Sequence, residues 1–341
     1  MKLFTCKCIE QYFFRLVVIV EFYKLVLYCA PLFYTMPRHV VKKGIPPTIG
    51  CYKIVKQLGA GSFGEIHLAR DTRTKNMVAI KFEKEDNYPE QLRFETMAYQ
   101  ALQHEKQFLG FAHMYDHGTI PGYHYLVLSM LGQSLDTLRM HPKVNNNAFS
   151  TKTLLMVADQ ALQRLETMHS LGFVHRDIKP GNMMMGLEGT REYPVLHLID
   201  FGLVKRFMDE RGRHMPKMEQ KTVVGTLLFM SINTQRGVEQ SRRDDLESLA
   251  YVLIFLGGGV MPWETMEVPR EKETVEALRL KIETPIDTIC RGLPDVFVYW
   301  LEYARGLAFE AKPDYKDLRK RIHACARKAG ITFDAVYDWD G

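Results

Sequence analysis

Three polar residues lie close together in the stretch Val-His-Arg-Asp-Ile-Lys-Pro-Gly-Asn-Met, residues 174–183. Asp177 carries a carboxylate that could orient and deprotonate a hydroxyl group. Asn182, five residues later, offers an amide oxygen of the kind that binds Mg²⁺. Lys179 could neutralise negative charge that builds up on a phosphoryl group during its transfer. These residue types at this spacing in a loop indicate phosphoryl-transfer chemistry, although a His-Arg-Asp tripeptide by itself would carry little information.

A second acidic residue follows an apolar strand pattern further along the chain. Asp200 stands in the sequence Leu-Ile-Asp-Phe-Gly-Leu, residues 198–203. Its carboxylate could bind the same metal ion as Asn182 from the other side.

Three glycines occur in Leu-Gly-Ala-Gly-Ser-Phe-Gly-Glu-Ile, at positions Gly59, Gly61 and Gly64. Glycines let a backbone approach phosphate groups closely and present its N–H groups to them. A dinucleotide-binding motif shares this spacing, but its glycines must open a helix. Here strand patterns lie on both sides, so a glycine hairpin is expected instead.

Lys81 ends the apolar sequence Val-Ala-Ile-Lys. A lysine within an apolar strand is costly unless an anion or a carboxylate meets it. The plain alternative is a strand lysine that faces solvent. Because the glycine hairpin precedes it, we expect Lys81 to face phosphate groups, and Glu95 on the following helix is the carboxylate that could pair with it.

The composition limits the class of protein. The chain has 341 residues, of which 46% are hydrophobic and 25% charged, so it can bury the core of one large domain or two lobes. The net charge of +5 is spread along the chain, which gives no support for nucleic-acid binding. The six cysteines lack metal-ligand spacing and favour a reducing intracellular setting as free thiols.

Residues 1–36 differ in character from the rest of the chain. They are rich in apolar and aromatic side chains, but Arg15, Glu21 and Lys24 interrupt them, and no uncharged run approaches the ~20 residues that a membrane span needs. No clear secretory signal is present. Three interpretations stay open: an interfacial amphipathic segment, an extra helix packed on the domain, or sequence that is not translated because Met36 is the start.

The remainder of the chain shows regular apolar periodicity. Residues 52–71 and 77–84 predict three strands with a glycine turn between the first two, and residues 125–131 predict a strand that runs into a linker. Asn145 to Asn147 predict a turn. Apolar residues at helical spacing predict helices over residues 89–103, 150–171, 242–256, 293–305 and 313–328. A sheet-rich part therefore precedes a helical part.

The glycine hairpin, Val-Ala-Ile-Lys, His-Arg-Asp-x-Lys-x-x-Asn and Asp-Phe-Gly occur in this order, and over residues 52–339 the chain resembles the eukaryotic protein kinases. The resemblance implies an α+β, bilobal fold with a small β-rich N-lobe and a larger α-helical C-lobe. It divides the chain into an N-terminal apolar extension (1–48), N-lobe and hinge (49–131) and C-lobe (132–341).

The resemblance also implies a site for ATP and Mg²⁺. Lys81 would contact the α- and β-phosphates, Asn182 and Asp200 would hold the metal, and Asp177 would act on the acceptor hydroxyl. Lys179 is the residue expected for Ser/Thr acceptors. The residues expected to bind ATP are Leu58, Gly59, Ala60, Gly61, Ser62, Phe63, Gly64, Ile66, Ala79, Lys81, Glu95, Leu128, Met130 and Leu131.

Several of these positions have a more specific expected role. Met130 and Leu131 would offer hinge backbone groups to adenine, and Leu128 would control the back pocket. Met183 to Met185 are expected to line the floor of the adenine pocket and the core. His175 is expected to be a packed residue rather than a base, because Asp177 already fills that role. Asp245 is expected to hold the catalytic-loop backbone.

A typical kinase has Ala-Pro-Glu where this chain has Ser231-Ile232-Asn233, and in this respect it is similar to the casein kinase I family. That resemblance would place the hydroxyl of Thr226 near Asp177, where it orders the acceptor site. The other shared motifs are Gly-Val-Glu-Gln-Ser-Arg-Arg-Asp-Asp-Leu-Glu-Ser-Leu-Ala-Tyr-Val-Leu, Leu-Gly-Gln-Ser-Leu-Asp-Thr-Leu, Met-Pro-Trp, Ala-Lys-Pro-Asp-Tyr-Lys-Asp-Leu and Tyr-Asp-Trp-Asp.

The chain departs from that family at Leu228, where an arginine that binds a phosphorylated or acidic residue upstream of the acceptor is usual. Losing the contact between this guanidinium and a phosphate removes ~1.5–3 kcal/mol. We therefore expect weakened recognition of primed substrates, which carry a phosphorylated residue upstream of the acceptor. Arg176, Lys205 and Lys221 fall where the family gathers positive charge for anion or substrate binding. Their alternative interpretation is a solvated basic face.

Together these observations predict an active, monomeric Ser/Thr protein kinase of the cytoplasm, the nucleus or both. It would be a transferase that uses MgATP and acts on protein Ser/Thr hydroxyls. The alternative is a catalytically weak or inactive kinase-fold scaffold, which the presence of all five core polar residues disfavours. Those residues are Lys81, Glu95, Asp177, Asn182 and Asp200. Membrane association through residues 1–36 is a further alternative.

Overall fold

The structure is a computed structural model that describes residues 44–61, 64–86, 91–104 and 108–340. Three parts of the sequence-based prediction lie outside the described residues: the apolar segment 1–36, the loop residues Ser62 and Phe63, and the first two residues of the helix predicted over 89–103. The chain divides into two units near residue 44, and the larger of them is Ile45–Gly341.

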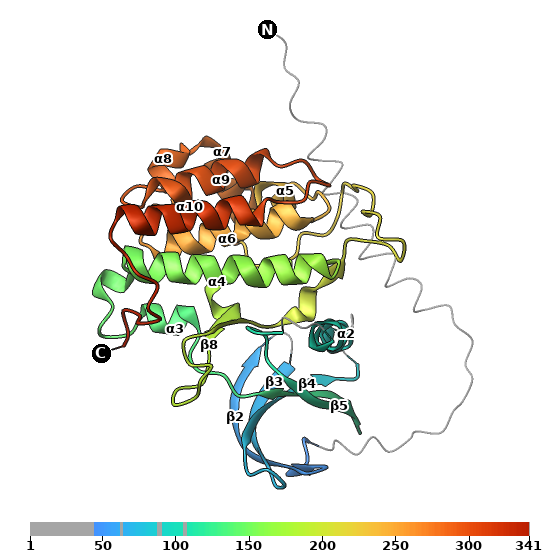
Figure 1. The fold of residues 1–341 in the computed structure, drawn as a ribbon. Helices are drawn as coiled ribbons and strands as arrows, with labels where there is room; N and C mark the ends of the chain where they lie inside the picture. The colour runs from blue at the N-terminus through green and yellow to red at the C-terminus, as the bar shows by residue number, and fades with distance from the viewer. Residues whose placement is uncertain (1–43, 62–63, 87–90, 105–107, 341) are drawn as a thin grey trace, which may run out of the picture. The chain divides into compact units, whose positions relative to one another are not determined.

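A six-stranded antiparallel sheet forms the first part of this larger unit (Figure 1), with strand order β1-β2-β3-β4-β6-β5. Alternating side chains explain its two faces. Val78, Ile80 and Phe82 pack into a small core on one face, so Ala79 and Lys81 point to the other. The strands are β1 Thr48–Ile49, β2 Tyr52–Gly61, β3 Gly64–Asp71, β4 Met77–Lys84, β5 Met114–Ile120 and β6 Tyr123–Ser129.

Helix α2, Gln91–Gln103, is the large helix of this lobe. Its buried side chains are Leu92, Glu95, Ala98, Tyr99 and Leu102, a spacing that gives one face toward the protein. The Glu83 carboxylate of β4 accepts hydrogen bonds from the backbone N–H groups of Gln91 and Leu92, at 3.2 and 2.9 Å. This contact fixes the start of the helix against the sheet and so positions Glu95.

The second part of the unit is mostly helical, and α4, α6 and α10 lie roughly parallel in Figure 1. Nearly every residue of α6 is buried, as expected for the central helix of a lobe. The helices are α3 Leu135–Arg139, α4 Thr151–Ser170, α5 Ile232–Gln235, α6 Arg242–Leu256, α7 Glu273–Glu283, α8 Ile286–Ile289, α9 Asp295–Gly306 and α10 Tyr315–Lys328.

Two short antiparallel ribbons pack against α4 and carry the polar loops. Strand β7 (Phe173–Val174) pairs with β10 (Lys205–Arg206), and β8 (Met183–Met185) pairs with β9 (Leu196–Leu198). The loop from β7 to β8 and the loop that follows β9 therefore emerge side by side. Single turns of 3₁₀ helix occur at Asn145–Asn147, Pro180–Asn182, Phe201–Leu203 and Arg270–Lys272.

The predicted α+β fold, with a β-rich lobe followed by a helical lobe, is confirmed. The helix predicted over 242–256 has the predicted bounds, and α10 begins two residues late because Asp314 caps it through the backbone N–H of Asp317. The strand predicted over 125–131 ends at Ser129. Among the described residues, no helix is both long and apolar enough to cross a bilayer.

Candidate active site

The four predicted catalytic side chains meet around Asp177, in the loop between β7 and β8. Lys179 donates to the Oδ2 atom of Asp177 at 2.6 Å, and the Thr226 hydroxyl donates to its Oδ1 atom at 2.7 Å. The Asn182 amide donates to the backbone carbonyl of Asp177 at 2.9 Å. The Asp177 carboxylate is therefore held between a cation and a hydroxyl group.

Asp245 of helix α6 holds the backbone of this loop. Its carboxylate accepts hydrogen bonds from the backbone N–H groups of His175 and Arg176, at 2.7 and 2.9 Å, and lies 2.9 Å from Nε2 of His169. Arg176 has a φ of 70°, a left-handed conformation that costs a non-glycine residue ~1–2 kcal/mol. Burial acts to raise the pKa of Asp245, but these hydrogen bonds and the nearby histidines lower it overall.

His175 is a packed residue, as expected. Its Nε2 atom lies 3.0 Å from the carbonyl of Ile199, its Nδ1 atom accepts from the backbone N–H of Asp177 at 3.2 Å, and its ring packs edge-on against Phe201. Both ring nitrogens are engaged, so the ring connects the catalytic loop to the loop that carries Asp200.

Lys81, Glu95 and Asp200 form a charge cluster in which Glu95 is buried and the other two are partly buried. The Lys81 ammonium donates to Glu95 at 2.6 Å and to Asp200 at 2.7 Å. Desolvation acts to lower the pKa of Lys81, but the two carboxylates raise it overall. Desolvation raises the pKa of Glu95. Burial acts to raise the pKa of Asp200 as well, but Lys81 lowers it overall. Lys81 thus pairs with both carboxylates, and Asp200 is the one that follows β9 and could hold a metal ion.

A cleft of about 590 Å³ lies beside this cluster, between the sheet and the helical lobe, which is within the usual size range for a cofactor site. Every predicted ATP-binding residue that the structure describes lines it. Met184 also lines it, while Met183 and Met185 are buried in the core. The cleft residues are Leu58, Gly59, Ala60, Gly61, Gly64, Ile66, Ala79, Lys81, Glu95, Tyr99, Ala112, Leu128, Ser129, Met130, Leu131, Gly132, Gly181, Asn182, Met184, Ile199 and Asp200.

Sequence reasoning missed part of this lining. Tyr99 lies one helical turn after Glu95, so helical spacing could have identified it. Ile199 directly precedes Asp200, and Gly181 directly precedes Asn182, so both could have been inferred from their neighbours. Ala112 carries no local signal and becomes a cleft residue only through the fold.

The glycines of the hairpin differ in what requires them. Gly64 has a φ of 119°, and a Cβ atom there would lie 1.9 Å from the carbonyl oxygen of Phe82. A Cβ atom at Gly59 or Gly61 would meet nothing within 4 Å. The protein's own packing therefore requires only Gly64, which leaves open backbone at the other two for a ligand to approach.

The polar residues of the cleft fit Mg²⁺ bound together with phosphates. Asn182 and Asp200 supply one amide and one carboxylate oxygen, and Mg²⁺ is usually held by one or two carboxylates plus substrate phosphates. Within the described ranges, no cluster of three or more His, Cys, Asp or Glu side chains forms a metal cage. The donor set therefore suits a metal that arrives with a nucleotide.

A comparison with protein-family models matches residues 52–322 to the protein kinase domain. The chain belongs to the protein kinase family. The match begins at the first residue of β2 and ends within α10, so it includes the cleft, the catalytic loop and the charge cluster of this kinase. Membership in the family implies protein substrates and, in general, the use of ATP and Mg²⁺.

The three basic residues predicted to bind an anion line a second pocket, beside α2. Glu239 forms ion pairs with two of them: its carboxylate lies 2.8 Å from the Lys205 ammonium and 3.5 Å from the Lys221 ammonium. Burial acts to raise the pKa of Glu239, but the two lysines lower it overall. Arg176 donates to the carbonyl of Leu203 at 2.6 Å. The structure thus brings the three cations to one pocket, and two of them pair with an internal carboxylate.

The segment that stands in place of Ala-Pro-Glu is held by side chains of α6. Ser231 caps α5 and donates to Asp244 at 2.6 Å, and the backbone N–H of Ile232 donates to Glu247 at 3.0 Å. Desolvation raises the pKa of Asp244 to about 6. Leu228 is half-buried and packs against the main core. These contacts fix the backbone of the segment against α6.

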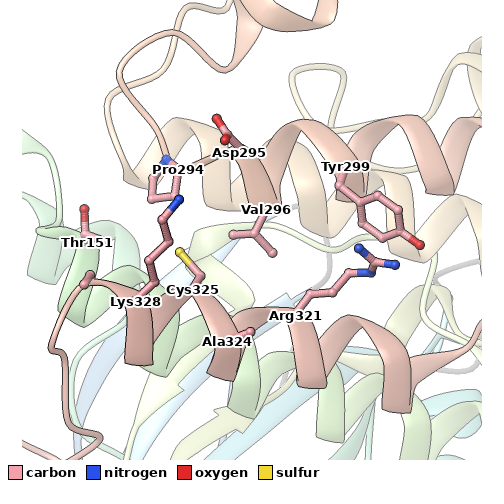
Figure 2. A pocket seen from close by; sticks show the side chains of 10 residues that line it. Thr151, Pro294, Asp295, Val296, Tyr299, Arg321, Ala324, Cys325 and Lys328 are labelled. Carbon is pink, nitrogen blue, oxygen red and sulfur yellow. The ribbon is translucent and has the colours of Figure 1, made fainter.

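A separate groove lies between α9 and α10, away from the cleft (Figure 2). The Arg321 guanidinium stacks 3.8 Å from the centre of the Tyr299 ring, and Val296 and Cys325 line the groove between the helices. None of the predicted site residues lines it.

Proposed function

We propose that this protein kinase transfers the γ-phosphate of ATP to Ser and Thr hydroxyl groups of proteins, and that it is casein kinase I-like. The observation that carries the proposal is the contact of Asp177 with both Lys179 and Thr226. A lysine at this place in the catalytic loop, together with a threonine hydroxyl on the same carboxylate, suits a short aliphatic hydroxyl as the acceptor.

Each residue of the site would have one task. Asp177 orients the acceptor hydroxyl and takes up its proton, and Lys179 neutralises the charge that develops between acceptor and phosphoryl group. Lys81, kept in place by Glu95, would contact the α- and β-phosphates. Mg²⁺, when bound, supplies positive charge to the phosphates, and Asn182 with Asp200 would hold it.

We propose further that recognition of primed substrates is weakened. Leu228 offers an apolar side chain at the position where a guanidinium would meet a phosphorylated residue. Glu239 already pairs with Lys205 and Lys221, so part of the positive charge nearby is neutralised within the protein. The kinase would therefore accept neutral and acidic sequences more evenly than a relative that carries arginine at position 228.

The test uses the purified chain, radiolabelled ATP with Mg²⁺ and a peptide array with phosphoserine, acidic and neutral series. We expect labelling of Ser and Thr peptides and no strong preference for phosphoserine three residues upstream. A strong preference of that kind would contradict the role given to Leu228. If the purified chain labels no peptide and an Asp177→Ala variant behaves identically, only a kinase-fold scaffold remains.

Two further proposals concern the state of the protein in the cell. We propose that the protein is a monomer and that it is found in the cytoplasm, the nucleus or both. Light scattering after size-exclusion chromatography tests whether it is a monomer. Comparing the fractionation of the full chain with one that begins at Met36 tests membrane association through residues 1–36, which equal solubility would dismiss.

A further inference from the structure

Lys281 of helix α7 is a fully buried lysine outside the catalytic cluster, with an exposure of 0%. Its ammonium donates hydrogen bonds to the backbone carbonyls of Leu227 and Met230, at 2.9 and 2.7 Å. These two residues come shortly after Thr226 in the loop that reaches Asp177. A side chain 51 residues away from Met230 in sequence thus contacts the loop that would receive the substrate.

The other polar groups of this loop are also engaged. The Trp263 indole N–H donates to the carbonyl of Leu228 at 2.9 Å. The carbonyl of Thr226 accepts from the backbone N–H groups of Phe229 and Met230, at 2.9 and 3.0 Å. Residues 226–230 therefore form a turn. The carbonyl of Thr226 is bonded within the turn, and the carbonyls of Leu227, Leu228 and Met230 are bonded by the side chains of Lys281 and Trp263.

The ammonium of Lys281 is surrounded mainly by aromatic rings and backbone carbonyls. Its ammonium lies 5.1 and 5.4 Å from the ring centres of Tyr251 and Trp263, an arrangement that favours a cation. Burial lowers the pKa of Lys281 to about 7, while Glu247 opposes that effect and Arg305 adds to it. A buried ammonium is costly unless its donors are satisfied, and here backbone carbonyls of the substrate loop satisfy them.

The opposite end of the loop is held by an anion of the same network. Glu247 accepts from the backbone N–H of Ile232 at 3.0 Å and from the Tyr251 hydroxyl at 2.8 Å. Arg305 donates to the backbone carbonyl of Lys281 at 2.9 Å. The loop is consequently clamped between a buried cation on its carbonyls and a buried anion on its amide, both fixed to the helices behind it.

We propose that Lys281 is a positioning residue for the phosphoacceptor site: through the carbonyls of Leu227 and Met230 it fixes the turn that presents Thr226 to Asp177. Lys281 does not line the nucleotide cleft, so it acts through the loop. This inference rests on the proposed kinase activity, because the position of Thr226 matters only if an acceptor hydroxyl binds at Asp177.

The experiment compares Lys281→Met with Lys272→Met, which makes the same change at an exposed lysine just before α7. Methionine keeps the length of the side chain and removes its donors, so in Lys281→Met the carbonyls of Leu227 and Met230 lose their partner. We expect the KM for peptide to rise about tenfold or more while the affinity for MgATP changes less than about twofold. Lys281→Arg, which keeps the cation, should restore part of the peptide KM.

Hydrogen exchange gives an independent readout on the same proteins. Backbone N–H groups of residues 226–232 should exchange faster in Lys281→Met, and those of α10 should not. If the parent shows no phosphotransfer, the proposed function fails, yet the exchange data still decide whether Lys281 holds the loop. Unchanged exchange together with unchanged peptide KM would overturn the inference, as would equal losses for peptide and ATP. If Lys281→Met does not fold, Lys281→Arg and Lys281→Gln decide on the same two measurements.

Discussion

Asp245 offers the sharpest test of how the fold positions the catalytic loop. In Asp245→Asn, one carboxylate oxygen becomes an NH₂ group, although three N–H groups or ring nitrogens face this side chain. At best the amide oxygen keeps the contacts of Oδ2 with His175 and His169, and then an NH₂ group faces the backbone N–H of Arg176. At least one charge-assisted hydrogen bond is lost from a nearly fully buried site.

The size of the effect can be worked out from these contacts. A hydrogen bond to a charged group contributes ~1.5–3 kcal/mol, and the remaining bonds weaken because their acceptor is no longer charged. We therefore expect the free energy of unfolding to fall by about 2 to 4 kcal/mol. Arg176 would also lose the contact that holds its left-handed backbone. A displacement of about 1 Å at the neighbouring Asp177 can lower the rate about hundredfold.

Urea unfolding at pH 7 measures the stability change, and phosphotransfer with saturating MgATP measures the rate. Asp244→Asn is the matched control, because that side chain is equally buried and one position away. Its carboxylate accepts hydrogen bonds from Ser231 and the backbone of Ser241, and Arg243 lies 3.7 Å away. The amide oxygen of an asparagine can accept from the backbone N–H of Ser241, and its NH₂ group can donate to the hydroxyl oxygen of Ser231. The role given to Asp245 is refuted if Asp245→Asn has the same free energy of unfolding and the same phosphotransfer rate as the parent. It is also refuted if the control variant loses as much activity as Asp245→Asn.

Three more substitutions probe the charge cluster, the substrate loop and the buried acid of α6. Lys81→Met should lower phosphotransfer at least about hundredfold and reduce stability by about 3 kcal/mol, since it leaves the buried Glu95 and the partly buried Asp200 without their cation; Lys84→Met on the exposed end of the same strand should do neither. Leu228→Arg should raise the preference for primed over unprimed peptides by about one to two decades, and an unchanged ratio would contradict the account of this position. The pKa of Asp244 is raised to about 6 from an ordinary value of 3.8, so its contribution to stability is full below pH 3.8 and is lost as the pH rises through about 6. The difference in unfolding free energy between the parent and Asp244→Asn should therefore shift by about 3 kcal/mol between pH 3.5 and pH 7, and a difference that is constant with pH would refute it.

The parts of the site that sequence could predict are those whose chemistry is local. Asp177, Lys179 and Asn182 lie in one loop, and Gly64 has a conformation that glycine alone adopts readily. The strands and long helices were predictable from periodicity because each has one apolar face. Their order along the chain then indicated which motifs belong to which lobe.

Other parts depend on contacts between distant segments and left no local pattern. Lysine is almost never fully buried, so nothing in the sequence of α7 marks Lys281 as an internal residue. Glu239 meets Lys205 and Lys221 only after β10 and the loop before α6 have come together. Neither contact can be inferred from spacing, because the partners lie on different elements whose approach is set by the packing of the whole helical lobe.

Glu239 has a consequence for any ligand that approaches these lysines. Because it is attached to the same chain, it acts as a tethered competitor, with an effective concentration that an external acidic peptide must match. A singly charged carboxylate would gain nothing by exchanging with it, and the exchange would leave a buried anion without its cations. Only a ligand of higher charge density, such as a phosphate dianion, could displace it, and its occupancy would fall steeply as salt is added.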